Sequence, residues 1–122
     1  MLLGDLYSYK IKEHCDGKID AVIELNKKHL IFKGHFPEYP LVPGVSQVLM
    51  VKEILNRCLN LNLQLISSKS IKFLAMITPN EIETLQLSIS YKKEADNSYK
   101  VNALLYGNET NFLKLKGNYS ER

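Results

Sequence analysis

The stretch VSQVLMVKEILNRCLN, residues 45–60, is the strongest indication of the fold, because it predicts a helix that is apolar around most of its circumference. The apolar side chains are Val45, Val48, Leu49, Met50, Val51, Ile54, Leu55, Cys58 and Leu59. A narrow polar stripe at helical spacing interrupts them, and it consists of Ser46, Glu53, Arg57 and Asn60. A helix this apolar is normally buried, so the rest of the chain is expected to cover it.

The segments on both sides of this helix predict strands. Residues 7–15 and 19–25 alternate between apolar and polar side chains, and Asp16-Gly17 between them is a strong hairpin signal. After the helix, strands are expected over residues 63–75 (broken at Ser67-Ser68), 84–92, 99–106 and 111–119. Short turns separate them. These elements predict an α+β fold in which an antiparallel sheet of about five to six strands curls around one long central helix.

Length and composition set limits on the classes of function. A chain of 122 residues is expected to form a single domain over residues 1–122. Its net charge of +3, with scattered lysines and no arginine-rich run, argues against nucleic acid as a partner. Two cysteines are too few for a disulfide-stabilised secreted domain, so we expect reduced thiols and a cytoplasmic protein. Neither a signal peptide nor a membrane span is predicted.

The loop before the helix, HFPEYPLVPGV over residues 35–45, holds the main candidate for chemistry. Three prolines within seven positions make it stiff and extended. His35 can accept a proton near neutral pH, and a helix start offers unpaired N–H groups to a developing negative charge. An isolated histidine would be interpreted as a packing residue. His14 and His29 show no metal-ligand spacing with each other or with the cysteines, so we predict no metal.

The pattern Gly34-His35-Phe36-Pro37-x-x-Pro40-x-x-Pro43-Gly44-Val45 resembles the active-site segment of the 3-hydroxyacyl-[acyl carrier protein] dehydratases. Residues 71–81 resemble the family's strand after the helix, and the likeness extends from about residue 6 to residue 119. The resemblance implies the hotdog fold, a homodimer or higher homo-oligomer, and no cofactor.

The resemblance also implies a reaction, the dehydration of a 3-hydroxyacyl thioester to the trans-2-enoyl thioester. His35 would remove the α-proton, and the backbone N–H groups of Gly44 and Val45 would stabilise the charge on the thioester oxygen. Pro43 and Phe36 would line the substrate-binding site. The thioester would be carried on acyl carrier protein or on CoA, and Lys27, Lys28 and Lys33 are candidates to meet an acidic carrier.

The family's acid, an Asp or Glu fourteen positions after the histidine, is missing from this sequence. Position 49 is Leu49, which cannot donate a proton. Glu53, one helical turn later, is a candidate for a displaced acid, although an ordinary i,i+4 pair with Arg57 is the alternative. Glu38 is a second candidate.

Three functional hypotheses therefore stand. The first is a dehydratase of fatty-acid or polyene type synthesis with His35 and Glu53 as its catalytic pair. The second is a catalytically impaired subunit that binds acyl chains or pairs with an active partner, which the leucine at position 49 motivates. The third is an acyl thioesterase, because the hotdog fold is shared with that class.

Overall fold

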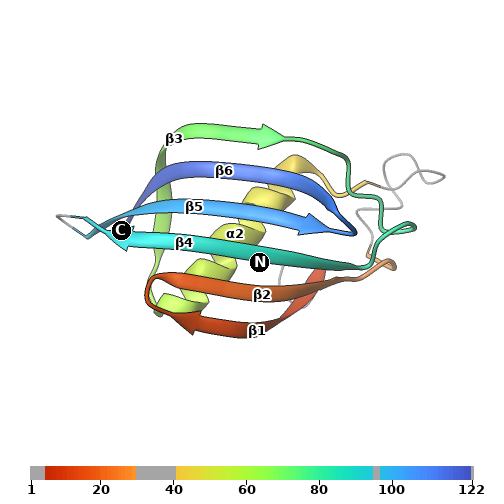
Figure 1. Cartoon of the computed structure of the whole chain (residues 1–122), viewed down its shortest axis with the longest axis horizontal. Coiled ribbons are helices and arrows are strands. Elements are labelled where there is room, and N and C mark those ends of the chain that lie inside the picture. The colour runs from red at the N-terminus through yellow and green to blue at the C-terminus, as the bar shows by residue number, and fades with distance from the viewer. Residues whose placement is uncertain (1–4, 30–40, 95–96, 122) are drawn as a thin grey trace.

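The computed structural model describes residues 5–29, 41–94 and 97–121. In these ranges, six strands form one antiparallel sheet in the order β1-β2-β4-β5-β6-β3, and one helix crosses a face of that sheet (Figure 1). The elements are β1 (Tyr7–Cys15), β2 (Lys18–Leu25), α2 (Gly44–Leu59), β3 (Leu63–Phe73), β4 (Thr84–Lys93), β5 (Ser98–Gly107) and β6 (Thr110–Glu121). The predicted sheet curled around a helix is confirmed, although the helix has only 16 residues.

Turn residues place the hairpins where the sequence predicts them. Asp16 and Gly17 have φ angles of 50° and 76° between β1 and β2, and Asn108 and Glu109 have 48° and 63° between β5 and β6. Left-handed angles at both central residues produce the turn whose twist matches that of the flanking strands. A Cβ at Gly17 would also lie 2.7 Å from the Tyr91 carbonyl oxygen, so this position requires glycine.

Strand β3 differs from the prediction. The sequence indicated a break at Ser67-Ser68, but the strand runs unbroken from Leu63 to Phe73. Its register against β6 shifts between Leu65 and Ser67, and again between Ser68 and Ser70. Each irregularity absorbs an extra residue without ending the pairing. Among the described strands, β3 pairs only with β6, so it forms one edge of the sheet.

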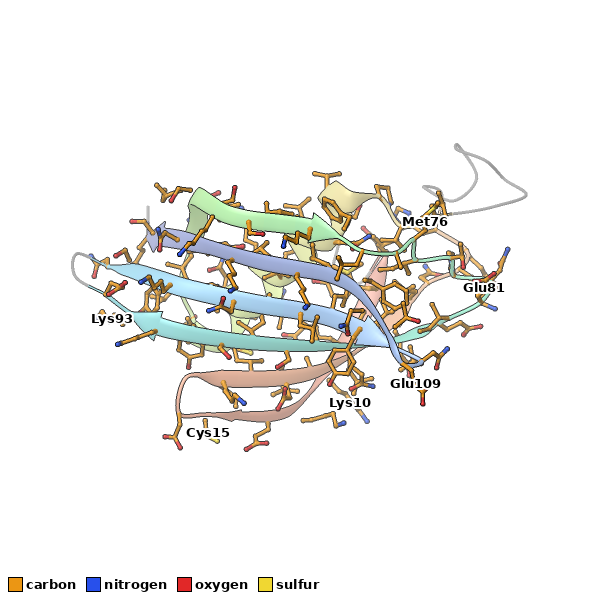
Figure 2. The ribbon with its side chains drawn as sticks, turned by 45° about the horizontal axis from the view of Figure 1, so that its top comes forward. Lys10, Cys15, Met76, Glu81, Lys93 and Glu109 are labelled. Atoms are coloured by element: carbon orange, nitrogen blue, oxygen red, sulfur yellow. The ribbon has the colours of Figure 1, made fainter. Side chains whose placement is uncertain are left out.

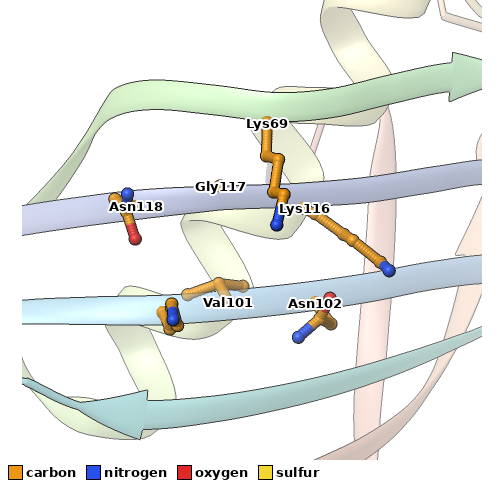
Figure 3. Close-up of a pocket in the computed structure, with 7 residues that line it drawn as sticks. Lys69, Val101, Asn102, Lys116, Gly117 and Asn118 are labelled. Carbon is orange, nitrogen blue, oxygen red and sulfur yellow. The ribbon is translucent and has the colours of Figure 1, made fainter.

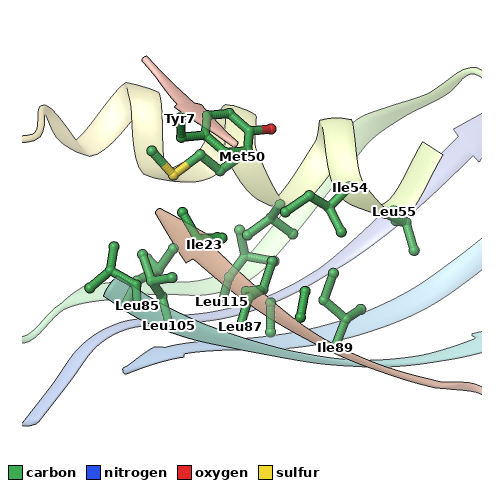
Figure 4. Close-up of a cluster of buried hydrophobic side chains, with 14 of the residues drawn as sticks. Tyr7, Ile23, Met50, Ile54, Leu55, Leu85, Leu87, Ile89, Leu105 and Leu115 are labelled. Atoms are coloured by element: carbon green, nitrogen blue, oxygen red, sulfur yellow. The ribbon is translucent and has the colours of Figure 1, made fainter. Parts of the chain in front are cut away.

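The core lies between the helix and the sheet, and Figure 4 shows the helix face directed at the strands. Met50, Ile54 and Leu55 are completely buried against side chains that alternate along the strands. Those strand side chains include Ile23, Leu85, Leu87, Ile89, Leu105 and Leu115. The alternation of buried and exposed positions on β4, for example, follows from one face of the strand meeting the helix.

The first turn of the helix departs from the predicted polar stripe. Ser46 and Gln47 are only 3% exposed, whereas Val45 is 69% exposed. Ser46 lies four residues before Met50 and eight before Ile54, so it shares the row of side chains that faces the sheet. Within the described residues, no helix is long and apolar enough to cross a membrane.

A candidate active site at the start of the helix

The N-cap residue of helix α2, Pro43, provides no side-chain hydrogen bond to the first turn. Pro43 precedes it with φ −59° and ψ 148°, and the first turn contains no acidic residue. The N–H groups of Ser46 and Gln47 donate to the Pro43 carbonyl at 3.1 and 3.2 Å. The N–H groups of Gly44 and Val45 precede the first helical hydrogen bonds, so they are available to an acceptor outside the helix. The helix dipole makes this end attractive to negative charge.

Gly44 is in close contact with Phe73, at the end of β3. A Cβ on Gly44 would lie 2.9 Å from the Phe73 Cζ atom, so the aromatic ring fills the space that the glycine leaves. Yet 52% of the Phe73 side chain remains exposed. The glycine therefore has a packing reason as well as the predicted role of letting a thioester approach the backbone.

Other exposed apolar side chains lie near the start of the helix. Leu74 is 49% exposed and Met76 is 74% exposed, on the segment that follows β3. Figure 2 shows Met76 projecting at the end of the molecule where the helix begins. Together with Val45 and Phe73, these residues form what we call the apolar rim. Grouped exposed apolar side chains are typical of sites that bind a partner or a ligand.

Residues just before the helix are held from two sides. The Val42 N–H donates to the Ile77 carbonyl at 2.9 Å, which ties this segment to the chain after β3. The Val42 carbonyl accepts a hydrogen bond from Gln47 Nε2 at 3.3 Å. The side chain of Gln47 therefore folds back toward the N-terminal end of the helix. The position of the first turn is fixed by these contacts.

Several predicted site residues fall outside the described residues. His35, Phe36 and Glu38 all lie in the segment 30–40, as does Lys33. Their roles stay predictions. Of the other lysines proposed to meet a carrier, Lys27 forms an ion pair with Glu83.

The two helix positions that bear on the missing acid lie farther along α2. Leu49 is half-buried, and Glu53, also half-buried, accepts a hydrogen bond from the Tyr7 hydroxyl at 2.8 Å. Burial raises the pKa of Tyr7 well above its usual value, and the bond to Glu53 raises it further, so Tyr7 stays protonated as the donor. Glu53 is nine residues beyond Gly44, or about 13 Å along the axis at about 1.5 Å per residue. Within one chain, Glu53 is too far from the helix start to protonate a group bound there.

The C-terminal half of the helix has its polar groups paired with neighbouring segments. The Asn56 side chain accepts from the Leu63 N–H at 2.8 Å and donates to the Leu63 carbonyl at 3.2 Å. Lys52 Nζ donates to Gln64 Oε1 at 3.1 Å. Asn60 ends the helix in a left-handed conformation, with φ 55° and ψ 46°. These bonds fix the turn from α2 into β3.

Lysines gather on the face of the sheet that points away from the helix. The six are Lys69, Lys72, Lys92, Lys100, Lys114 and Lys116, and all are exposed. Across neighbouring strands, Lys72 faces Lys114 and Lys92 faces Lys100. Glu94 pairs with Lys100 at 3.6 Å. We call this set the lysine face, and it corrects the sequence-based view that these lysines are scattered.

Part of the lysine face surrounds an open depression of about 240 Å³. Figure 3 shows Lys69 and Lys116 beside it, with Asn102 and Asn118 also on its walls. Like charges directly opposite each other destabilise a sheet, so this arrangement costs stability. The signal in the sequence was the spacing of two between Lys114 and Lys116, which places both side chains on one face of a strand.

No metal centre emerges from the part of the chain that the structure describes. No group of three or more His, Cys, Asp or Glu side chains in these ranges could hold a metal ion. His14 Nε2 instead shares a hydrogen bond of 2.8 Å with the Tyr91 hydroxyl at the surface. Cys15 and Cys58 are both free thiols.

Solved structures with this fold include dehydratases and thioesterases. The dehydratase heterocomplex ApeI:P from Xenorhabdus doucetiae superposes with a TM-score of 0.71 and 22% identity, covering 92% of this chain and 95% of that chain. A hypothetical thioesterase with coenzyme A from Streptococcus pneumoniae superposes with a TM-score of 0.68 and 15% identity, covering 94% and 88%. Identities this low show the fold alone, which is the hotdog fold.

Comparison of the amino-acid sequence with known proteins defines the class of protein more closely than the fold does. The 3-hydroxyacyl-[acyl-carrier-protein] dehydratase FabZ of Ruminiclostridium cellulolyticum is 27% identical over 101 residues, covering 74% of this chain and 68% of that protein. The fold and these matches define a dehydratase-like hotdog protein. More narrowly, residues 11–110 match the ApeI-like family, described as ApeI dehydratase, and the chain belongs to this family.

Proposed function

We propose that this protein takes part in the dehydration of a 3-hydroxyacyl thioester, carried on acyl carrier protein, to the trans-2-enoyl thioester. The observation that carries the proposal is the start of helix α2, where the Gly44 and Val45 N–H groups have no acceptor within the helix, directly after the His35 motif. Membership of the ApeI-like family supports the same reaction class. A carrier-bound substrate would also place the protein in the cytoplasm.

In the proposed reaction, neutral His35 takes the α-proton and the thioester oxygen gains negative charge. The helix start stabilises this oxyanion through the Gly44 and Val45 N–H groups. An acid then protonates the β-hydroxyl, which leaves as water while the α,β double bond forms. Pro43 and Phe36 contribute to the walls around the acyl group. No cofactor is needed for this proton balance.

The acid has two proposed sources, and both require a second chain. Glu53 of a second copy is one, if its carboxylate exchanges the Tyr7 hydroxyl for the substrate. The other is a carboxylate on a different hotdog chain, placed where this chain has Leu49. The second source is supported by the similar ApeI:P structure, which is a dehydratase heterocomplex. It would make this chain the partner of an acid-bearing subunit.

An assembly of two or more chains fits the surface. Strand β3 has an open edge, and the apolar rim lies at its C-terminal end. An interface between two chains could pair the exposed edge of β3 and bury the apolar rim at the same time. We expect sedimentation to show a homodimer or a larger homo-oligomer when the chain is alone. A stable monomer would point to a hetero-oligomer as the working form.

The lysine face supports an acidic partner such as a carrier protein. Several ammonium groups with few acidic neighbours create a positive potential that attracts an acidic surface. Turnover of a carrier-bound substrate is then expected to fall with rising salt more steeply than turnover of the same acyl-CoA.

The central test follows the enoyl product from 3-hydroxyacyl thioesters on carrier protein and on CoA. Wild-type turnover that disappears in His35→Ala supports the proposal, and turnover that survives this change contradicts it. If the chain alone is inactive, Leu49→Glu is expected to create activity, whereas the matched Leu49→Gln is not. Release of free thiol without enoyl product would instead identify a thioesterase, the alternative that shares this fold.

A further inference from the structure

Two buried side-chain atoms in the described part of the chain have no hydrogen-bond partner, Gln47 Oε1 and the Tyr119 hydroxyl. Gln47 is the more informative, because it is 3% exposed and sits in the first turn of α2. A buried acceptor without a donor lowers the stability of the folded protein, because it has lost its hydrogen bonds to water. A helix that only needed packing at this position would be more stable with an apolar side chain.

The identity of the unpaired atom follows from its neighbour. The Val42 carbonyl can only accept, so the amide nitrogen of Gln47 must face it, at 3.3 Å. The amide oxygen is therefore the atom left without a partner, and rotating the amide by half a turn would set two acceptors against each other. Because Val42 lies two residues before the helix, this oxygen lies at the same end of α2 as the N–H groups of Gly44 and Val45.

We propose that Gln47 is a substrate-binding residue whose Oε1 accepts a hydrogen bond from the 3-hydroxyl group of the acyl thioester. This inference rests on the proposed function. A thioester has no donor of its own, and the 3-hydroxyl is the donor nearest to its carbonyl, three bonds away. An oxyanion bound at the Gly44 and Val45 N–H groups therefore brings the hydroxyl to the first turn of the helix, where Gln47 lies.

This contact gives Gln47 a defined part in the reaction. When the hydroxyl donates its proton to Gln47, its lone pairs point away from the amide and toward the incoming acid. The hydroxyl then leaves in a fixed orientation. The contact also makes the site selective, because an acyl thioester without the hydroxyl leaves the buried oxygen unpaired, as it is in the free protein.

The test compares two proteins with two ligands. Wild type and Gln47→Met are titrated with 3-hydroxyhexanoyl-CoA and with hexanoyl-CoA, which lacks only the hydroxyl. Methionine keeps the length of the side chain and removes its polar atoms. Loss of one hydrogen bond is expected to weaken binding of the hydroxylated ligand about tenfold and to leave hexanoyl-CoA binding unchanged. Without ligand, Gln47→Met should melt at the same temperature as wild type or higher.

Three results would overturn the proposal. One is an equal loss for both ligands, which indicates a structural role. Another is unchanged discrimination between the ligands in a folded Gln47→Met protein. The third is a wild type that binds both ligands equally well. Ser46→Ala, at the adjacent buried polar position, is the matched control and should retain wild-type discrimination. If wild type binds neither thioester, the proposed function fails, and this inference fails with it.

Discussion

The two halves of helix α2 differ in the hydrogen bonding of their polar side chains. In the C-terminal half, Glu53 and Asn56 are tied by hydrogen bonds to Tyr7 and Leu63. In the N-terminal turn, the buried Gln47 oxygen is unpaired and the N-cap residue Pro43 forms no side-chain hydrogen bond. Hydrogen-bonded polar groups stabilise the fold, whereas buried polar groups without a partner lower its stability. This difference supports the proposal that the N-terminal turn binds the thioester, whereas the bonds of the C-terminal half stabilise the fold.

The strongest expected effect on stability comes from Asn56. Asn56→Ala removes both bonds to Leu63 and is expected to lower the free energy of unfolding by about 3 kcal/mol, a fall of about 10 °C in Tm. Asn62→Ala, at an exposed position, serves as the control in thermal unfolding. If Asn56→Ala has the same Tm as wild type, the hydrogen bonds in the C-terminal half of the helix do not stabilise the fold.

The next effect should appear at the N-terminal turn, in activity. Gly44→Ala places a methyl group at the backbone that the thioester must approach, and we expect kcat/KM to fall about 100-fold. The same methyl group would also press on the Phe73 ring. The double variant Gly44→Ala/Phe73→Ala removes that contact and should stay slow. Full recovery of activity in the double variant would show that Gly44 serves packing and not the substrate.

A smaller effect is expected from Tyr7. Tyr7→Phe keeps the ring and deletes the hydroxyl that donates to Glu53, so stability should fall by about 1.5 kcal/mol. Denaturant unfolding measures this change, and kcat/KM measured on the folded protein should match wild type. A change in turnover with unchanged stability would instead favour Glu53 of a second copy as the acid, the first of the two proposed sources.

The smallest change concerns the lysine face. Lys114→Gln relieves the repulsion with Lys72, so the protein should gain about 0.3 kcal/mol in unfolding free energy. Affinity for a carrier-bound substrate should decrease at low salt, while affinity for the acyl-CoA stays the same. Equal affinities for the carrier-bound substrate in Lys114→Gln and wild type would remove this lysine from the proposed docking surface.

The sequence predicted most of the fold because its periodicities are regular. Thr84 to Lys92 alternates cleanly and forms β4, and the apolar stretch after Pro43 forms α2. The prediction failed at Ser67-Ser68, where small polar residues indicated a break. Bulges let β3 continue there, and they depend on pairing with β6 that no local pattern encodes.

The candidate site was predictable only in part. The motif before the helix indicated Gly44 and Val45, but Gln47 was missed because a polar residue in a helix is normally expected at the surface. Its burial depends on the rotation of α2 against the sheet, which the mixed pattern of the first turn does not fix. The Tyr7–Glu53 bond was missed as well, because 46 residues separate the partners in the sequence.

We expect the acyl thioester to bind at the N-terminal turn of α2 and not along its C-terminal half. Backbone amide NMR shifts on titration with 3-hydroxyhexanoyl-CoA test this most directly, because they report each position without requiring turnover. The largest shifts are expected at the backbone amides of Gly44 and Val45, together with the side-chain amide of Gln47. Shifts concentrated at Glu53 to Asn60, with the first turn unchanged, would contradict it.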